Sequence, residues 1–454
     1  MSDASAHRKR AIRESEGEAL RKVISRQDHA DWQPAPGRDP LAILAESDAG
    51  RLPDLVPRRY KKMRKNSFTF LRGAAAVMAA DLIGRPMAGI PVQACGDCHI
   101  GNFGVFPSPE GRAVFDINDF DETMPDVDFT VDIKRLAASV AVEALAEAEF
   151  DAETAREAAR ASVRAYREHM HRLAQMEPLA CWRSSIDLDH EISHIDDDPS
   201  RHEVRAGLEA GLSDALQSAD VPGLAPETKD GPPATWRIAD DGKKVFHALA
   251  DGDDTPVRDA RIGLLAYPNS LSPERRALVA RYGLRDVAFK VVGIGSVGRV
   301  CAVGLYTDAD GAPLFLQIKE ARPSVLAPLV LGQLPSSIDD GQRIVQGQRI
   351  MQAASDLFLG TARSPTSGRS YYVRQLKNHK LSDVAGLMSK DEPRRYARLC
   401  GRTLARAHAR SGDAATIAGY LGEDDVFDEA IACFAWRYAT QTQDDHAALV
   451  ARDD

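Results

Sequence analysis

Residues 95–104 read CGDCHIGNFG, and residues 114–122 read VFDINDFDE. In the first string a glycine-punctuated loop carries Asp97 and, five positions later, Asn102. In the second string a β-favouring run, Val114 to Ile117, is followed at once by further carboxylates. Catalytic loops of kinase type present an Asp that orients the acceptor hydroxyl, an Asn five positions later that binds Mg²⁺, and an Asp after the next strand that binds the metal. The two strings therefore predict a loop that presents a base together with metal ligands.

Composition indicates an ordinary globular protein. The 454 residues, of which 44% are hydrophobic, predict two or three domains with a large core. A formal net charge of -9 argues against a general nucleic-acid-binding surface. Six scattered cysteines are too few for a disulfide framework in a chain of this length, and neither an apolar N-terminal segment nor a run of membrane-spanning length is present. We therefore expect a cytoplasmic protein with no membrane or nucleic-acid partner.

Changes of pattern along the chain predict four segments. Residues 1–45 mix charges with prolines and are expected to form a weakly ordered arm. Residues 46–283 are expected to form the first part of a helical lobe, which carries both strings above. Residues 284–378 are expected to form a small β-rich lobe, and 379–454 the remaining helices. Helical periodicity is clear from 132 to 144, from 151 to 178, where Asp151 is a candidate N-cap, and from 394 to 410.

The segment 287–319 reads as strand, glycine-rich turn, strand, hairpin turn and strand. Its G-x-G-x-x-G motif places glycines at Gly293, Gly295 and Gly298, with Ser296 between them, and the last strand ends in Lys319. A glycine loop followed by a strand lysine is typical of the phosphate-binding part of a kinase small lobe. The dinucleotide-binding alternative requires a helix directly after the last glycine, whereas residues 299–303 favour a strand. An ordinary glycine-rich hairpin with a surface lysine is the competing structural interpretation.

Basic residues that precede the first string could form part of a binding site. Arg64, Lys65 or Arg72 could bind an anionic substrate group, although a solvated helix face is the simpler interpretation of the charged run that contains the first two. Arg72 differs, because it follows an aromatic pair and precedes Gly73 instead of lying in that run.

Three other motifs compete with this interpretation. The pattern C-x-x-C-H at 95–99 is that of c-type haem attachment, which requires export, and no signal peptide is seen. The same C-x-x-C could be a redox pair or half of a zinc site, but a second C-x-x-C is missing, and small buried cysteines are the simpler interpretation. The zincin-like string HEISH at 190–194 lies among aspartates and a proline that disfavour the required helix.

Several strings together resemble the bacterial domain-of-unknown-function family 2252, over about residues 45 to 450. They are RGAA at 72–75, CGDCHIGNFG at 95–104, VFDINDFDE at 114–122, DIKRLAAS at 132–139, QRIMQAASD at 348–356, YYVRQL at 371–376 and AHARSGD at 407–413. A more distant similarity is to the aminoglycoside-phosphotransferase branch of kinase-like proteins, whose loop of His-Gly-Asp-x-His-x-x-Gly-Asn type resembles residues 95–102. That similarity implies a catalytic role for Asp97 and metal-binding roles for Asn102 and Asp119, with Asp116 as the rival of Asp119.

Two features depart from the kinase-like pattern. Cys95 stands where the first His of the loop is expected, and the helix expected after Lys319 carries no Glu to pair with that lysine. Together these departures favour a nucleotide-binding regulatory pseudoenzyme as one alternative. A metal-dependent phosphohydrolase built on Asp97, His99, Asp116 and Asp119 is the other.

The resemblance and the motifs lead to one main expectation. We expect an α+β protein with a kinase-like two-lobed fold that uses ATP and Mg²⁺ to phosphorylate an unknown hydroxyl acceptor. Gly293, Gly295, Ser296, Gly298 and Lys319 would bind the nucleotide.

The order of the motifs predicts a circular permutation, because the glycine loop and Lys319 follow the catalytic loop instead of preceding it. The helix at 394–410 should then lie beside Asp97. Lys319 and Asp119 should face one cleft with their side-chain ends within about 10 Å, because both must reach the same triphosphate.

Overall fold

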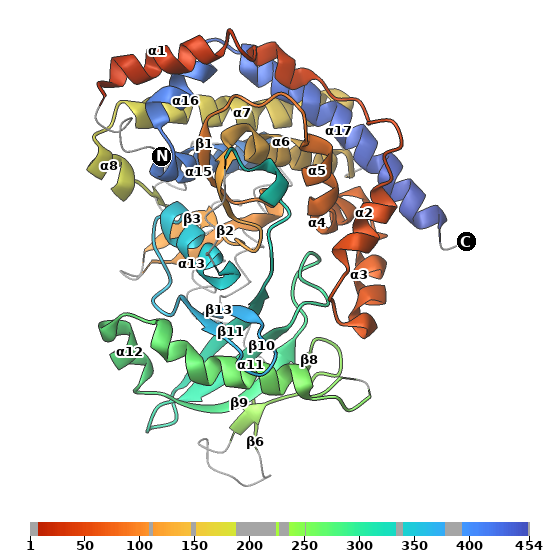
Figure 1. Cartoon of the computed structure of the whole chain (residues 1–454), viewed down its shortest axis with the longest axis vertical. Coiled ribbons are helices and arrows are strands. Elements are labelled where there is room, and N and C mark those ends of the chain that lie inside the picture. Colours follow the sequence, from red (N-terminus) through yellow and green to blue (C-terminus); the bar gives the residue numbers. More distant parts are fainter. Residues whose placement is uncertain are drawn as a thin grey trace, which may run out of the picture.

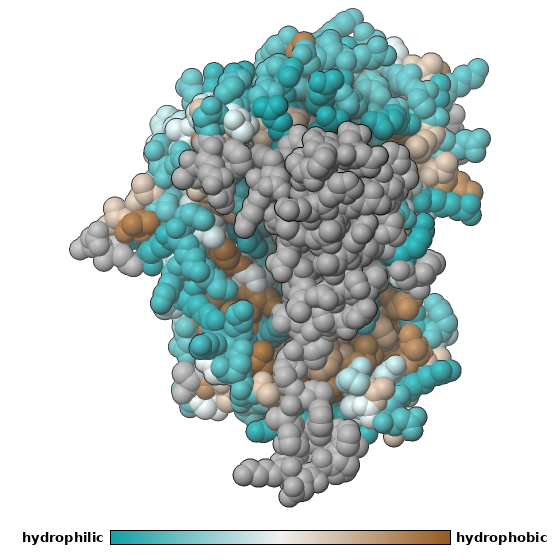
Figure 2. All heavy atoms as spheres, turned by 180° about the vertical axis from the view of Figure 1, so that it is seen from behind, coloured by the Kyte–Doolittle hydropathy of each residue, from teal (hydrophilic) through white to brown (hydrophobic). Residues whose placement is uncertain are grey.

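The computed structural model describes residues 8–108, 112–146, 151–187, 224–226, 236–249, 251–332, 339–376 and 393–452. Within these ranges the protein combines helices and strands, which confirms the α+β class. Helices gather at one end of the molecule and a large sheet at the other (Figure 1). Seen from behind, hydrophilic side chains dominate the helical end, and hydrophobic atoms are visible over the lower part (Figure 2).

The largest hydrophobic core lies among helices from distant parts of the chain. Asp151 caps one of them as predicted, because its side chain accepts a hydrogen bond from the Thr154 amide at 2.8 Å. Gly401, on a second helix, permits a close approach to this one, since a Cβ at that position would lie 2.0 Å from the Ser162 carbonyl oxygen. The helices of this core are α6 (Phe129–Ala146), α7 (Ala152–Ala174), α15 (Pro393–Ser411), α16 (Ala414–Leu421) and α17 (Val426–Ala451).

The N-terminal arm is packed against this core. It forms α1 (Arg10–Leu20), which lies on α16, and α2 (Pro40–Ser47). Trp32 and Leu44 are buried, and Arg38 donates hydrogen bonds to two carboxylates, Asp81 and Asp445, at 2.6 Å each. The expectation of a weakly ordered arm does not hold for residues 10–45, because buried apolar groups and paired charges offset the entropy of ordering them.

A six-stranded antiparallel sheet forms the second core, in the order β12-β13-β11-β10-β9-β8. Its strands are β8 (Val245–Phe246), β9 (Gly283–Lys290), β10 (Cys301–Thr307), β11 (Pro313–Ala321), β12 (Gly360–Arg363) and β13 (Ser370–Gln375). The helix α11 (Thr255–Ala266) packs on this sheet, and α12 (Pro273–Val279) follows it. The sheet unit therefore begins near residue 245, earlier than the boundary at 284 expected from sequence. The acidic, weakly patterned residues before 284 hid this helix and the short edge strand.

Short ladders and helices lie between the large sheet and the helical core. β1 (Pro91–Ala94) pairs with β4 (Met124–Asp128), and β2 (Phe103–Pro107) pairs with β3 (Ala113–Ile117), which also pairs with β5 (Ile186–Asp187). Further elements are α3 (Val56–Met63), α4 (Ser67–Gly73), α5 (Ala75–Leu82), α8 (Pro178–Arg183), α13 (Asp340–Met351), β6 (Leu224–Pro226) and β7 (Trp236–Ile238). Among the described helices, none has both the length and the apolar character needed to cross a membrane.

Candidate functional site

The loop between β1 and β2 is held by a single buried carboxylate. Asp132, in the first turn of α6, accepts hydrogen bonds from the amides of Cys95 at 2.6 Å and Gly96 at 3.0 Å. His408 Nε2, on α15, lies 3.2 Å from the same carboxylate. Gly96 has φ +93°, and a Cβ there would lie 2.2 Å from the Glu122 carbonyl oxygen, so glycine is required at this position. The loop backbone is therefore fixed against both α6 and the turn that follows β3.

Asp97 projects from this loop with one oxygen paired. Its Oδ1 accepts hydrogen bonds from Arg135 Nε at 3.0 Å and Nη2 at 2.7 Å, and its Oδ2 lies 3.7 Å from His99 Nε2. Burial raises the pKa of Asp97, although the Arg135 guanidinium acts in the opposite direction. Burial also lowers the pKa of His99 well below its usual value, so that ring is neutral. Arg135 thus orients a carboxylate whose second oxygen is left for another partner.

Asn102 is oriented by the same loop. Its Nδ2 donates a hydrogen bond to the Asp97 carbonyl oxygen at 2.6 Å. With the amide nitrogen used in this way, the amide oxygen is the group that remains to accept a hydrogen bond or to bind a cation.

The two candidate metal ligands that follow the loop between β1 and β2 lie in different surroundings. Asp116, on β3, is fully buried, accepts a hydrogen bond from Arg406 Nη2 at 2.5 Å, and accepts another from the Ala353 amide at 2.8 Å. Asp119, in the turn after β3, has a side chain that is 34% exposed and lines a cavity. Asp116 therefore cannot bind a metal in this cavity, because it lies outside the cavity lining and its carboxylate forms a fully buried ion pair with Arg406.

Lys319 meets the same turn from the large sheet. Its Nζ donates hydrogen bonds to both oxygens of Asp121, at 2.9 and 2.8 Å, and lies 3.6 Å from Asp119 Oδ1. Asp121 also accepts hydrogen bonds from Ser296 Oγ at 2.9 Å and from the Tyr372 hydroxyl at 2.6 Å. Burial alone would raise the pKa of Asp121, but the nearby positive charge of Lys319 outweighs it and holds the pKa below its usual range. Lys319 and Asp119 thus lie well within the separation of about 10 Å expected from sequence.

The glycine-rich turn between β9 and β10 lies over the same place. Gly293, Gly295 and Ser296 line the cavity, whereas Gly298 lies at the end of the turn with φ +88° and does not. Arg51 holds the turn by donating hydrogen bonds to the carbonyl oxygens of Gly295 at 2.9 Å and Val297 at 2.6 Å. The segment is therefore a glycine-rich turn between two antiparallel strands, as predicted, and its conformation is set by an arginine from the N-terminal half of the chain.

These groups enclose a cavity of about 270 Å³. It is lined by four carboxylates and five guanidinium groups, those of Asp97, Asp119, Asp121, Glu122, Arg51, Arg59, Arg72, Arg299 and Arg322, together with His99, Asn102 and the glycine turn. Of the residues predicted from sequence, Asp97, Asn102, Asp119, Gly293, Gly295 and Ser296 line it, and Lys319 lies directly behind through Asp119 and Asp121.

Several cavity residues were missed by the sequence analysis. Asp121 is the clearest, and its signal was the density of carboxylates in the string DFDE, where it follows Asp119 by two positions. Glu122, the last residue of that string, accepts hydrogen bonds from Arg299 Nη2 at 2.8 Å and from the Val325 amide at 2.9 Å. Arg135, which pairs with Asp97 but does not itself line the cavity, had no such signal, because an arginine on a helix is most often solvated.

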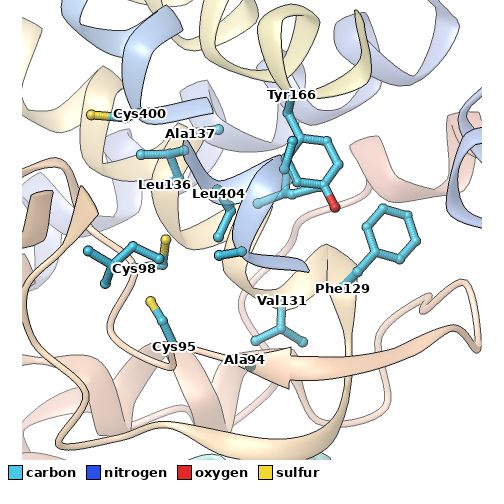
Figure 3. Packing of buried hydrophobic residues seen from close by; sticks show 14 of the residues in the cluster. Ala94, Cys95, Cys98, Phe129, Val131, Leu136, Ala137, Tyr166, Cys400 and Leu404 are labelled. Carbon is cyan, nitrogen blue, oxygen red and sulfur yellow. The ribbon is translucent and has the colours of Figure 1, made fainter. Parts of the chain in front are cut away.

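The C-x-x-C pair lies beneath the loop, in the hydrophobic core. Cys95 and Cys98 lie close together among buried hydrophobic residues (Figure 3). Their sulfurs and a carboxylate oxygen of Asp132 lie within 4.8 Å of one another, and all three residues are buried. Asp132 already accepts two backbone hydrogen bonds, and burial raises the pKa of both thiols. The pair therefore packs as two protonated thiols. The HEISH string at 190–194 lies outside the described residues.

Comparison with known proteins identifies the family. The model of a family described as uncharacterized protein conserved in bacteria (DUF2252) matches residues 51–452, so the chain belongs to that family. No curated protein and no solved structure matches the chain.

Proposed function

We propose that the protein is a phosphotransferase that uses Mg²⁺ and a nucleoside triphosphate, with ATP as the expected donor, to phosphorylate a hydroxyl acceptor. The observation that carries this proposal is that residues from distant parts of the chain meet at one cavity. Asp97, Asn102 and Asp119 meet the glycine turn and Lys319 at one cavity, although Lys319 and Asp121 stand 198 positions apart in sequence.

The chemistry of the cavity supports this assignment of roles. The Asp119 carboxylate and the Asn102 amide oxygen are the hard oxygen ligands that Mg²⁺ prefers, and the bound metal would neutralise charge on the transferred phosphoryl group. Lys319 and the glycine turn would contact the phosphates of the nucleotide. At about 270 Å³ the cavity suits phosphate groups and a metal, with the rest of the nucleotide extending out of it.

Asp97 would orient the acceptor hydroxyl and accept its proton. Arg135 holds Oδ1, which leaves Oδ2 to face the acceptor. Because burial raises the pKa of Asp97, its carboxylate accepts a proton more readily than an exposed one would.

The arrangement of elements supports a permuted kinase-like fold as part of the proposal. The glycine turn follows the first strand of the β9-β10-β11 meander, the lysine lies on the third strand, and helix α13 follows, which is the order expected of a kinase small lobe. Helix α15 lies beside the catalytic loop, with the Tyr396 hydroxyl 3.0 Å from the Ile100 carbonyl oxygen. In the absence of a Glu on α13, Asp121 takes the place of the usual helical partner of Lys319.

One observation favours a nucleotide-binding module without turnover as a second candidate. Lys319 already donates two hydrogen bonds to Asp121, so a phosphate must compete with that carboxylate for the ammonium group. A metal-dependent phosphohydrolase is less well supported, because Asp116 lies outside the cavity in a closed ion pair.

Two substitutions separate these functions. Asp97→Asn should keep Mg-ATP binding, measured by calorimetric titration, yet lose ATP turnover by a factor of about 10² or more. Asp119→Asn should weaken the Mg²⁺-dependent binding itself. Asp310→Asn, in the exposed turn between β10 and β11, is the control and should change neither quantity.

The outcomes discriminate between the candidates. Turnover that survives both Asp97→Asn and Asp119→Asn would contradict the proposed roles. Binding of Mg-ATP by the wild-type protein without turnover would favour the regulatory module.

A further inference from the structure

Arg72, in the last turn of α4, differs from the other arginines of the cavity. Arg51 and Arg59 donate hydrogen bonds to backbone carbonyl oxygens, Arg299 to Glu122, and Arg322 to the Ala49 carbonyl oxygen at 2.7 Å. Arg72 makes no hydrogen bond or ion pair with any residue that the structure describes. Its Nε is buried without a partner, as are those of Arg59 and Arg299, but those two arginines are paired through their other nitrogens. A guanidinium group that lines a cavity and lacks an internal anion can bind one from outside at low cost.

The position of Arg72 places it on the Asp97 side of the cavity. A Cβ at Gly101 would lie 3.6 Å from Arg72 Cζ and 3.2 Å from the His99 ring, so the absence of a side chain there leaves room beside the guanidinium. The His99 ring in turn lies 3.7 Å from Asp97 Oδ2. The Phe68 ring lies 5.8 Å from Arg72 Cζ, within the range of a cation–π interaction. Arg72 is therefore placed to contact the molecule that Asp97 would orient.

Positive charge continues from Arg72 to the surface. Burial lowers the pKa of Lys62, on α3, and the positive charges of Arg58, Lys244 and Arg72 lower it further. The guanidinium of Arg58 also donates a hydrogen bond to the Lys243 carbonyl oxygen, which joins α3 to the turn before β8. This rim of cations would attract an anion toward Arg72.

We propose that Arg72 binds an anionic group of the acceptor, a phosphate or a carboxylate, so that the acceptor is a small hydroxyl compound with a negative charge of its own. That the bound molecule is the acceptor of the reaction rests on the proposed function. That Arg72 binds an anion does not depend on it. In the reaction the acceptor hydroxyl oxygen bonds to the γ-phosphorus of ATP as the bond from that phosphorus to the β-phosphate oxygen breaks. ADP leaves, and the hydroxyl proton passes to Asp97.

The test uses three matched probes, glycerol 3-phosphate, glycerate and glycerol, with binding measured by calorimetric titration. The wild-type protein should bind one or both anions more tightly than glycerol by at least about tenfold, and the preferred anion tells phosphate from carboxylate. Arg72→Gln should reduce anion binding by about 10- to 100-fold, a larger loss than any change in Mg-ATP binding, although Arg72 lines the same cavity. Arg281→Gln, at an exposed arginine on the sheet side, is the matched control and should change nothing.

A second variant tests the anion site independently, in case Arg72→Gln does not fold. Gly101→Val keeps the guanidinium but fills the space beside it, and should weaken anion binding in the same way. If the wild-type protein prefers glycerol, or if Arg72→Gln binds both anions as the wild type does, the anion site is wrong even when Mg-ATP binds. If anion binding depends on Arg72 but Mg-ATP does not bind, the anion site stands and the proposed function fails.

Discussion

Strand β3 and the turn after it each place a carboxylate against a cation from far along the chain, but the two pairs differ in their access to solvent. Asp116 and Arg406 are both 0% exposed. Asp121 and Lys319 are 10% and 4% exposed and lie at the cavity beside Asp119. Because both pairs are buried, neither by itself is strong evidence of a stabilising interaction.

The surroundings explain what each pair does. Asp116 also accepts a hydrogen bond from the Ala353 amide, and Arg406 also donates one to the Met351 carbonyl oxygen at 2.8 Å. This pair therefore connects β3 with α15 and with the end of α13. Asp121 is shared among Lys319, Ser296 and Tyr372, all from the sheet unit. The first pair is therefore structural, whereas the second pair lies where, under the proposed function, a phosphate would compete with Asp121 for Lys319.

The largest expected effect comes from breaking the closed pair. Arg406→Met leaves the Asp116 carboxylate buried without a cation, and should lower the free energy of unfolding by about 3–5 kcal/mol, measured by urea denaturation. Mg-ATP should stabilise this variant as much as it stabilises the wild type, because the cavity is untouched. Arg164→Ala, which removes an exposed pair with Glu168, is the control and should cost less than about 1 kcal/mol.

Breaking the pair at the cavity should cost less. In Lys319→Met the Asp121 carboxylate keeps its hydrogen bonds from Ser296 and Tyr372, so a loss of about 1–3 kcal/mol is expected. The stabilisation by Mg-ATP, measured as a rise in melting temperature, should disappear. Equal losses in Lys319→Met and Arg406→Met would remove the distinction between the two pairs.

Two of the four carboxylates that line the cavity, Asp121 and Asp97, should change the stability of the protein in opposite directions when they are neutralised. Asp121 has a lowered pKa, so its contribution to stability is present above its unfolded pKa and is lost as the pH falls through the folded pKa. Asp97 has a raised pKa, so folding disfavours its charged form and stability falls as the pH rises through the folded pKa. At neutral pH, Asp121→Asn should therefore destabilise the protein and Asp97→Asn should stabilise it.

Urea denaturation of both variants checks this prediction. The increase in unfolding free energy expected for Asp97→Asn should become smaller as the pH is lowered toward the folded pKa of Asp97, because the wild-type carboxyl group then becomes neutral as well. A destabilised Asp97→Asn variant at neutral pH would show that the hydrogen bonds from Arg135 outweigh the cost of burial.

The smallest effect is expected from a third, partly exposed group of charges on the sheet unit. His247 contacts Asp240 at 2.6 Å and Asp286 at 3.0 Å, and the hydrogen bond to Asp286 raises its pKa. The stabilisation that protonated His247 adds to the folded state is fully present below its unfolded pKa of about 6.5. It is lost as the pH rises through the pKa of His247 in the folded protein. His247→Gln should flatten the dependence of unfolding free energy on pH just above 6.5, by less than about 1 kcal/mol.

Local patterns predicted local structure well. The glycine turn, the strand that carries Lys319 and the cap at Asp151 each depend on neighbouring residues, and each was visible in the sequence. The helix expected at 394–410 spans Pro393–Ser411.

Pairings between distant residues could not be predicted in the same way. Asp116 and Arg406 are 290 positions apart, and nothing near Asp116 shows that its partner would exclude it from the cavity. The choice of Asp121 over Asp119 as the main partner of Lys319 also depends on how two distant segments meet. Trp32 is an isolated apolar residue in a polar segment, so its burial follows from tertiary packing and not from periodicity.

A crystal structure of the complex with Mg²⁺ and a non-hydrolysable ATP analogue tests the central claim most directly. The account predicts phosphates between the glycine turn and Asp119, with Mg²⁺ about 2.0–2.1 Å from oxygens of Asp119 and Asn102. It also predicts that Lys319 turns from Asp121 toward a phosphate. An analogue bound away from this cavity, or one whose metal contacts neither Asp119 nor Asn102, would contradict it.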